Sequence, residues 1–284
     1  MKPAPFAYHR AHSVSEAVAL LAELGDEAKI LAGGLSLVPM MNFRLARPAA
    51  LVDVTPIDGL SYLTVDPPGG LRIGALTTHR TVETSRAPEV LAGFGVLPRS
   101  ARWIGHYPIR SRGTFGGSIA HADPASEWCL LAVLLGAHVV LTGPQGQRTM
   151  PVTEFFEGYY TTAIGADEMV TELRFPEPAP RAVLTEFAQR QGDFAVVAAA
   201  VSLDITGDAC DGGRVVLGGV GPLPVEVDTA ALAGQPAGPQ TWQAMGEHAA
   251  SQIDPPEDTH GDAGFRRRLT ATLVARALAE ASQL

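Results

Sequence analysis

The chain has 284 residues, 46% of them hydrophobic and 18% charged, which is enough for a folded soluble protein of one to three domains. Its formal net charge of −9 argues against nucleic acid or an anionic membrane surface as the main partner, because attraction to phosphate needs an excess of lysine and arginine. The start, MKPAPFAYHR, lacks an apolar leader, and no window approaches the roughly 20 apolar residues of a membrane span, so we expect a cytoplasmic protein.

The first predicted helix runs from about Ser13 to Leu24. Ser13 and Glu16 have the spacing of a capping box, in which both side chains accept hydrogen bonds from amides at a helix start. Apolar residues then recur at helical spacing until Gly25 ends the pattern.

A short buried strand, AKILA, follows and leads into the pair Gly33-Gly34. SLVPMMNFRL is a second predicted helix with Pro39 near its first turn, and ALVDV is a second strand. A tight turn would explain one glycine of the pair. The other indicates a ligand, or another segment of chain, pressed against the bare backbone.

The pattern then predicts a second, larger group of elements. We expect a strand at residues 71–76, helices from residue 78 and over 89–103, a turn-rich stretch up to residue 123, a strongly apolar helix over 125–136, and strands at 138–141 and 169–175.

PEPAPRA is the clearest composition break, because its three prolines do not fit inside regular structure. We place a domain boundary there, with one domain over 1–177, divided into subdomains at about 1–58 and 59–177, and a smaller one over 181–284. Strand-like runs and then helices over 240–252 and 262–281 predict an α+β domain with an antiparallel sheet. The basic run Arg266 to Arg268 is interpreted as a solvated helix face.

A second glycine stretch, RSRGTFGGSIAHADPASEW, has the same ingredients as the first. The amides of Gly116, Gly117 and Ser118 are candidates for binding an anion, and Asp123 with Pro124 predicts the cap and first turn of the apolar helix. Two such turns could hold a pyrophosphate from both sides, with hydroxyl donors from Ser36, Thr114 and Ser118. Plain tight turns are the alternative.

No metal site is expected. Cys129 and Cys210 stand alone, without the paired spacing of an iron–sulfur or zinc site, and there is no HExxH. The fingerprints GxGxxG and GxxxxGK[ST] are also absent, which excludes the usual dinucleotide fold and the P-loop.

LAGGLSLVP, IRSRGTFGGSIAHADPASEW and RQGDFAVVAAAV together resemble the FAD-binding medium subunit of the molybdenum hydroxylases, the family of carbon monoxide dehydrogenase and xanthine dehydrogenase. The resemblance spans the whole chain. It implies an α+β fold: a two-part FAD-binding domain of the vanillyl-alcohol-oxidase (PCMH) type and a smaller C-terminal domain.

The resemblance also implies which residues bind FAD. One stretch would hold the pyrophosphate, a second would line the other side of the cofactor, an aspartate would lie near the ribityl or phosphate groups, and an aromatic residue would lie against the isoalloxazine ring. In that order, these residues are Ala32, Gly33, Gly34, Leu35, Ser36 and Leu37; Thr114, Phe115, Gly116, Gly117 and Ser118; Asp123; and Phe194. For Phe194, a place in the core is the alternative.

Two positions depart from the family pattern. Relatives often carry histidine or glutamine at Leu35, so one side-chain contact is missing here. Many carry lysine at the position of Glu186, and a carboxylate there would reverse the charge near the ring and leave a reduced, anionic flavin less stabilised. We expect Glu186 to be part of the cofactor site.

By resemblance, a large subunit with a molybdenum cofactor oxidises the substrate, a small subunit with [2Fe–2S] clusters relays electrons, and this chain collects them on FAD for an external acceptor. The flavin carries the redox chemistry, so no catalytic residue is expected. The alternatives are a stand-alone flavin oxidase or reductase, a non-catalytic scaffold subunit, and an enzyme acting on another nucleotide pyrophosphate. HADPASEW favours the hydroxylases of aromatic rings and nitrogen heterocycles.

Overall fold

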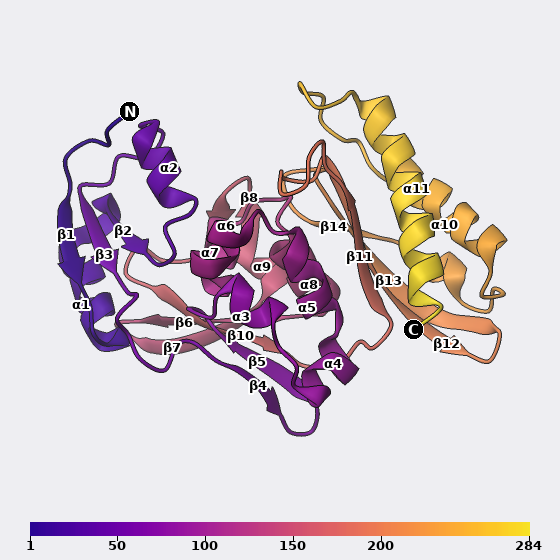
Figure 1. Ribbon diagram of the computed structural model, residues 1–284, viewed down its shortest axis with the longest axis horizontal. Helices are drawn as coiled ribbons and strands as arrows, with labels where there is room; N and C mark the ends of the chain where they lie inside the picture. Colours follow the sequence, from indigo (N-terminus) through magenta and orange to yellow (C-terminus); the bar gives the residue numbers. More distant parts are fainter.

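The computed structural model describes all 284 residues and builds the chain around three main sheets, one after another along the sequence (Figure 1). The α+β fold class is confirmed, with antiparallel pairing in the second and third sheets. No helix is long and apolar enough to cross a lipid bilayer.

The N-terminal unit is a three-stranded parallel sheet in the order β1-β3-β2. Ser13 caps its first helix by accepting from the amide of Glu16, as predicted from the capping box. The elements are β1 (Ala7–Arg10), α1 (Val14–Leu24), β2 (Ala28–Leu31), α2 (Leu37–Asn42) and β3 (Ala50–Asp53).

The middle unit is a five-stranded antiparallel sheet in the order β4-β5-β10-β6-β7, with most of the helices near its face. Its strands are β4 (Leu63–Asp66), β5 (Gly70–Gly74), β6 (His138–Gly143), β7 (Gly146–Pro151) and β10 (Met169–Phe175), with a small hairpin of β8 (Phe156–Gly158) and β9 (Thr161–Thr162). Its helices are α3 (His79–Glu83), α4 (Pro88–Phe94), α5 (Val96–Ser100), α6 (Tyr107–Arg112), α7 (Phe115–His121), α8 (Glu127–Leu134) and α9 (Val152–Phe155).

Two predictions for this unit are wrong. The helix expected over 89–103 is broken into α4, α5 and a 3₁₀ turn (Ala101–Trp103), because Gly95 lies at the first break and Pro98 has no amide to continue the ladder. The stretch expected to be turn-rich contains two short helices, α6 and α7.

The C-terminal unit is a four-stranded antiparallel sheet in the order β11-β12-β13-β14, with α10 and α11 on its outer face (Figure 1). Its elements are β11 (Ala182–Phe187), β12 (Val197–Thr206), β13 (Ala209–Gly218), β14 (Val225–Val227), a 3₁₀ turn (Ala230–Leu232), α10 (Pro239–Ser251) and α11 (Ala263–Ala281). Asp262 caps α11 through the amide of Phe265.

Helix α8 connects the middle and C-terminal units. All of its residues are buried, as expected for a helix that is apolar on every side, and it packs against α7 and against β12 and β13. The core therefore continues from the five-stranded sheet through α8 to the inner face of the third sheet, where Ala198 and Val216 belong to the same cluster.

The interpretation of the basic run as a solvated helix face is wrong for its first residue. Arg266 is 4% exposed, and its guanidinium donates to the carbonyl oxygens of Val196 and Gly219 and pairs with Asp258 at 2.7 Å. Its hydrogen bonds hold the loop before β12 and the end of β13 against α11.

Candidate functional site

The first glycine stretch, Ala32 to Leu37, joins the end of β2 to the start of α2. None of its amide groups donates a hydrogen bond within the chain, and its residues are half-buried. Gly34 has a φ of 74°, which lies in the left-handed region that favours glycine. Successive unpaired amides in such a turn form a concave surface that accepts anions.

Gly33 is needed for a different reason, because it allows two backbone segments to approach each other closely. A β-carbon at Gly33 would lie 2.2 Å from the carbonyl oxygen of Arg112 and 2.9 Å from the α-carbon of Gly113. The first glycine stretch therefore contacts the backbone just before the second one. The Arg112 side chain is exposed and forms no ion pair.

The second glycine stretch does not present free amides, contrary to our expectation. It forms the first turn of α7, where Thr114 is the N-cap and accepts from the amide of Gly117 at 3.2 Å. The amide of Gly116 donates to the carbonyl of Ala75, and that of Ser118 donates to the carbonyl of Thr114. Any ligand on this side would meet side chains and carbonyl groups.

The residues of this stretch also differ in how accessible they are to a ligand. Phe115 is fully buried and stacks on Trp128 with ring centroids 4.6 Å apart, so only its backbone could contact a ligand. A β-carbon at Gly116 would lie 2.6 Å from the β-carbon of Ala75, so this glycine serves packing between α7 and the end of β5. Ser118 is half-buried.

Asp123 is not the cap of the apolar helix. That helix, α8, begins at Glu127 with Ser126 as its N-cap, whereas Asp123 accepts from the amide of Ala125 in a turn and from the hydroxyl of Tyr160 at 3.3 Å. Asp123 is 8% exposed. The sequence analysis predicted the helix correctly but placed its N-cap at Asp123, whereas the observed N-cap is Ser126.

The third stretch, RQGDFAVVAAAV, contacts the N-terminal end of α6. A β-carbon at Gly192 would lie 2.6 Å from Cε1 of His106, which is the N-cap of α6. The other end of this six-residue helix, about 9 Å away, is Arg112, which contacts Gly33. The three stretches that carry the resemblance are therefore brought together along one short helix.

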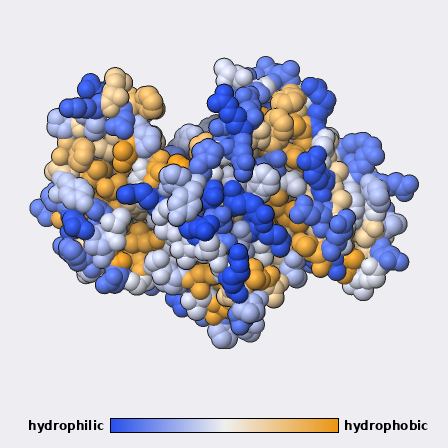
Figure 2. All heavy atoms as spheres, in the orientation of Figure 1, coloured by the Kyte–Doolittle hydropathy of each residue, from blue (hydrophilic) through white to orange (hydrophobic).

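Phe194 is 63% exposed, so a place in the core is excluded for this side chain. It lies in the loop before β12. Figure 2 shows that the surface is hollowed between the lobe that carries α2 and the lobe that carries α11.

Glu186 lies near the end of β11, and its Oε2 atom is buried without a hydrogen-bond partner. Glu127, the first residue of α8, is 8% exposed and forms no ion pair. Burial raises the pKa of both carboxyl groups, and for Glu127 the charge of Glu186 adds to the effect. The raised pKa values favour the protonated form of both groups near neutral pH, which reduces the negative charge expected at Glu186.

The sequence analysis did not identify His79, a buried residue that packs against Gly113 in the second glycine stretch. Its Nδ1 accepts from Nε1 of Trp128 at 2.9 Å, and a β-carbon at Gly113 would lie 2.5 Å from its Nε2. Burial, with the nearby charge of Arg110, lowers the pKa of His79 to about 4. The ring is therefore neutral and acts in packing. In the sequence, Gly113 within RSRGTF was the one indication that another side chain packs closely against this backbone.

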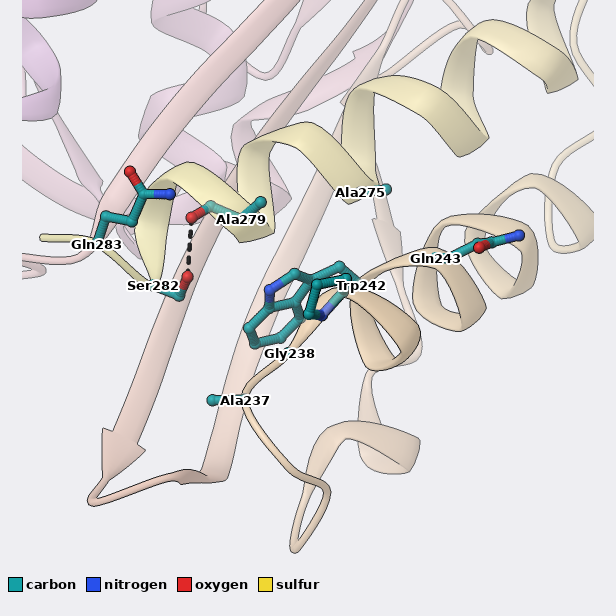
Figure 3. Close-up of a pocket in the computed structure, with 9 residues that line it drawn as sticks. Ala237, Gly238, Trp242, Gln243, Ala275, Ala279, Ser282 and Gln283 are labelled. Atoms are coloured by element: carbon teal, nitrogen blue, oxygen red, sulfur yellow. Dashed lines mark hydrogen bonds between the residues drawn. The ribbon is translucent and has the colours of Figure 1, made fainter.

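The structure contains no group of three or more histidine, cysteine, aspartate or glutamate side chains that could hold a metal ion. A separate hollow of about 380 Å³ lies between α10 and α11, where Trp242 and Ser282 are among the lining residues (Figure 3). It has no charged lining residue and lies away from the glycine stretches, so it does not fit a diphosphate.

The residues around α6 fit a cofactor with a diphosphate. They offer unpaired amides at Ala32 to Leu37, a backbone contact that only glycine permits at Gly33, and an exposed aromatic at Phe194.

Models of two domain families match the chain over nearly its whole length. Residues 4–178 match the model of the FAD binding domain in molybdopterin dehydrogenase, and residues 182–281 match that of the CO dehydrogenase flavoprotein C-terminal domain. The chain is 37% identical to the 6-hydroxypseudooxynicotine dehydrogenase complex subunit alpha of Paenarthrobacter nicotinovorans, covering 99% of this chain and 96% of that protein. It is 36% identical to the carbon monoxide dehydrogenase medium chain of Hydrogenophaga pseudoflava, covering 98% and 97%.

Solved structures give the same result. Quinoline 2-oxidoreductase from Pseudomonas putida 86 superposes with a TM-score of 0.95 at 33% identity, and carbon monoxide dehydrogenase from Hydrogenophaga pseudoflava with 0.94 at 36%. Each match covers 100% of this chain and 99% of the other. The chain therefore belongs to the family of FAD-binding medium subunits of the molybdenum hydroxylases, which are oxidoreductases, and FAD is its cofactor.

Proposed function

We propose that this chain is the FAD subunit of a cytoplasmic molybdenum hydroxylase complex, which takes electrons from a [2Fe–2S] subunit and passes them to an external acceptor. A large subunit with the molybdenum cofactor would oxidise the substrate. Support comes from relatives that are named as medium chains or complex subunits of dehydrogenases and that align over nearly their whole length. When bound, FAD supplies the two-electron redox chemistry, and the protein orients it and sets its electrostatics.

The observation that carries the proposal is the run of unpaired amides from Ala32 to Leu37, fixed against Arg112 by the bare backbone of Gly33. These amides would bind the pyrophosphate. The stretch Thr114 to Ser118 would line the other side through its hydroxyl and carbonyl groups.

Three further residues complete the proposed site. Asp123 would lie near the ribityl or phosphate groups, Phe194 would cover the ring and exclude water, and Glu186 would face the ring. Residues 1–177 would form the FAD-binding domain, divided at about residue 58, and residues 181–284 the C-terminal domain.

The first test is cofactor binding by the purified chain. We expect a visible flavin spectrum, one FAD per chain, and much weaker binding of FMN, which lacks the pyrophosphate and adenosine groups. A colourless chain that takes up no FAD would contradict the proposal and favour a scaffold subunit.

The second test is electron transfer in the complex, prepared by co-expression with the genes beside this one. We expect substrate to bleach the flavin only when the molybdenum and iron–sulfur subunits are both present. Bleaching of the isolated chain by a substrate would instead favour a stand-alone flavin enzyme.

A further inference from the structure

Arg266 lies on α11, but its guanidinium is buried between two backbone segments of the third sheet. Its Nη1 donates to the carbonyl oxygens of Val196, just before β12, and of Gly219, just after β13, the second at 2.8 Å. Its Nη2 pairs with Asp258 at 2.7 Å. Because only 4% of the side chain is exposed, water does not compete for these hydrogen bonds.

Stability alone does not explain a charge at this position. Removing a guanidinium from water costs free energy, and Nε of Arg266 has no hydrogen-bond partner that offsets the cost. An apolar side chain, such as those of Leu273 and Val274 on the same buried face of α11, would pack without that cost. What the arginine adds is a planar group with several donors in fixed directions, which can hold two carbonyl groups at once.

Gly219 connects this contact to the second glycine stretch. Its amide donates to the carbonyl of Pro124 at 3.3 Å, beside Asp123. Its φ of 73° lies in the left-handed region, and a β-carbon there would lie 2.5 Å from the carbonyl oxygen of Val196. Only glycine therefore fits at this position, and the residue that accepts from Arg266 also donates to the turn that contains Asp123.

Val196 connects the same contact to Phe194. Its amide donates to the carbonyl of Phe187, at the end of β11, at 2.8 Å, and its carbonyl accepts from Arg266, so both of its backbone polar groups are held. Phe265, which precedes Arg266, packs edge to face on Phe187 with ring centroids 6.0 Å apart. Phe194 itself is 63% exposed and has little packing of its own, so its direction depends on the backbone two residues away.

We propose that Arg266 is a positioning residue of the cofactor site: one guanidinium holds the backbones that carry Asp123 and Phe194, and so fixes the acid and the aromatic ring relative to each other. It acts through Val196 and Gly219 and is not a catalytic residue. The role of Asp123 and Phe194 toward FAD rests on the proposed function. The hydrogen bonds of Arg266 do not, because they belong to the chain without its cofactor.

Hydrogen exchange of the full chain without flavin tests these hydrogen bonds. We expect Arg266→Met to raise the exchange rate of the amides of Val196 and Gly219 at least about tenfold, because two hydrogen bonds from a charged donor are lost. Exchange in β10, in the middle sheet, is the internal reference for opening of the whole chain. Arg266→Lys keeps the charge but not the planar fork, so it should give a smaller rise, and it carries the test if Arg266→Met does not fold.

Arg267→Met is the matched control, because it removes the same charge from the next residue of α11. The Arg267 side chain is 41% exposed, and it donates to the carbonyl of Ile253 and to Asp254, in the segment between α10 and α11. It makes no hydrogen bond to a motif stretch. The control should therefore leave the exchange of the Val196 and Gly219 amides unchanged.

The visible spectrum of bound FAD tests the positioning role. We expect a shifted spectrum in Arg266→Met and a smaller shift in Arg266→Lys, whereas Arg267→Met should match the wild-type chain. When Arg266→Met is introduced into Phe194→Ala, it should change the spectrum much less, because the ring through which it acts is missing. A general loss of stability would not produce this dependence on Phe194.

Unchanged exchange at Val196 and Gly219 in both Arg266 variants would overturn the inference at its base. Faster exchange with an unchanged flavin spectrum would overturn the positioning role and leave Arg266 as a purely structural residue, and so would an equal spectral shift with and without the Phe194 ring. Faster exchange in a chain that binds no FAD would keep the hydrogen bonds and remove the proposed function together with the positioning role, which separates the two failures.

Discussion

The α-carbon of Gly33 lies against the carbonyl group of Arg112, so closely that a β-carbon at Gly33 would be 2.2 Å from the oxygen. The contact joins the loop after β2 to the end of α6 and sets the position of the unpaired amides. It also answers why two glycines are needed in sequence: Gly34 adopts a left-handed φ, and Gly33 allows two backbones to touch.

The first prediction is that Gly33→Ala weakens FAD binding at least about tenfold, because the added methyl group must push the amides away from Arg112. Flavin fluorescence quenching on titration measures the affinity. Gly212→Ala is the matched control, since a β-carbon at Gly212 meets nothing within 4 Å. An unchanged affinity in Gly33→Ala would show that this contact does not position the cofactor.

Elements with a strong periodic pattern and a clear cap could be predicted from the sequence. Ser13 begins α1 and Asp262 begins α11 as the cap rules require, and β10 matches its apolar run. Helix α7 could not be predicted this way, because Gly116 and Gly117 lower helix propensity in its first turn. The packing of Gly116 on Ala75 and the cap at Thr114 decide the structure there.

The residue pairs at the site could not be predicted from the sequence for a different reason. His79 and Trp128 are 49 residues apart, and nothing in either segment indicates the other. The same is true of Glu127 and Glu186, because the packing of β11 is not apparent from its sequence. The glycine stretches were recognisable, but which amides are free depended on tertiary contacts.

The second prediction concerns the cap of α7. Thr114→Ala should lower the free energy of unfolding by about 1 kcal/mol, because the amide of Gly117 loses its acceptor. Thr114→Ser keeps the hydroxyl and should retain most of the stability. Urea denaturation measures both variants, and equal stability of the alanine and serine variants would contradict the role of the cap.

The third prediction is a loss of stability in acid caused by His79. Its pKa is about 4 in the fold and 6.5 in an unfolded chain, so the unfolded state takes up a proton first as the pH falls. The contribution is fully present above about pH 6.5 and is lost down to about pH 4, by roughly 3 kcal/mol in total. His79→Gln should flatten this part of the profile of unfolding free energy against pH, and exposed His12→Gln should not.

The fourth prediction has the opposite sign and concerns Glu127 and Glu186. Their pKa values in the fold lie above 4.5, the value in an unfolded chain, so the native state holds more protons in between. Stability from this pair is full below about pH 4.5 and falls as the pH rises through the raised values. The double glutamine variant should lack this decline in unfolding free energy. A decline of the same size in the variant would assign it to other groups.

The fifth prediction separates folding from cofactor binding at Phe194. Since the side chain is 63% exposed, Phe194→Ala should change the free energy of unfolding of the flavin-free chain by less than about 0.5 kcal/mol. If the ring covers the flavin, the same variant should shift the visible spectrum and the fluorescence of bound FAD, because water then reaches the isoalloxazine. Phe6→Ala, at another exposed aromatic position, 39% exposed and next to β1, is the control for the spectrum. A large loss of stability in Phe194→Ala would mean that the side chain packs in the fold, and an unchanged spectrum would mean that it does not contact the ring.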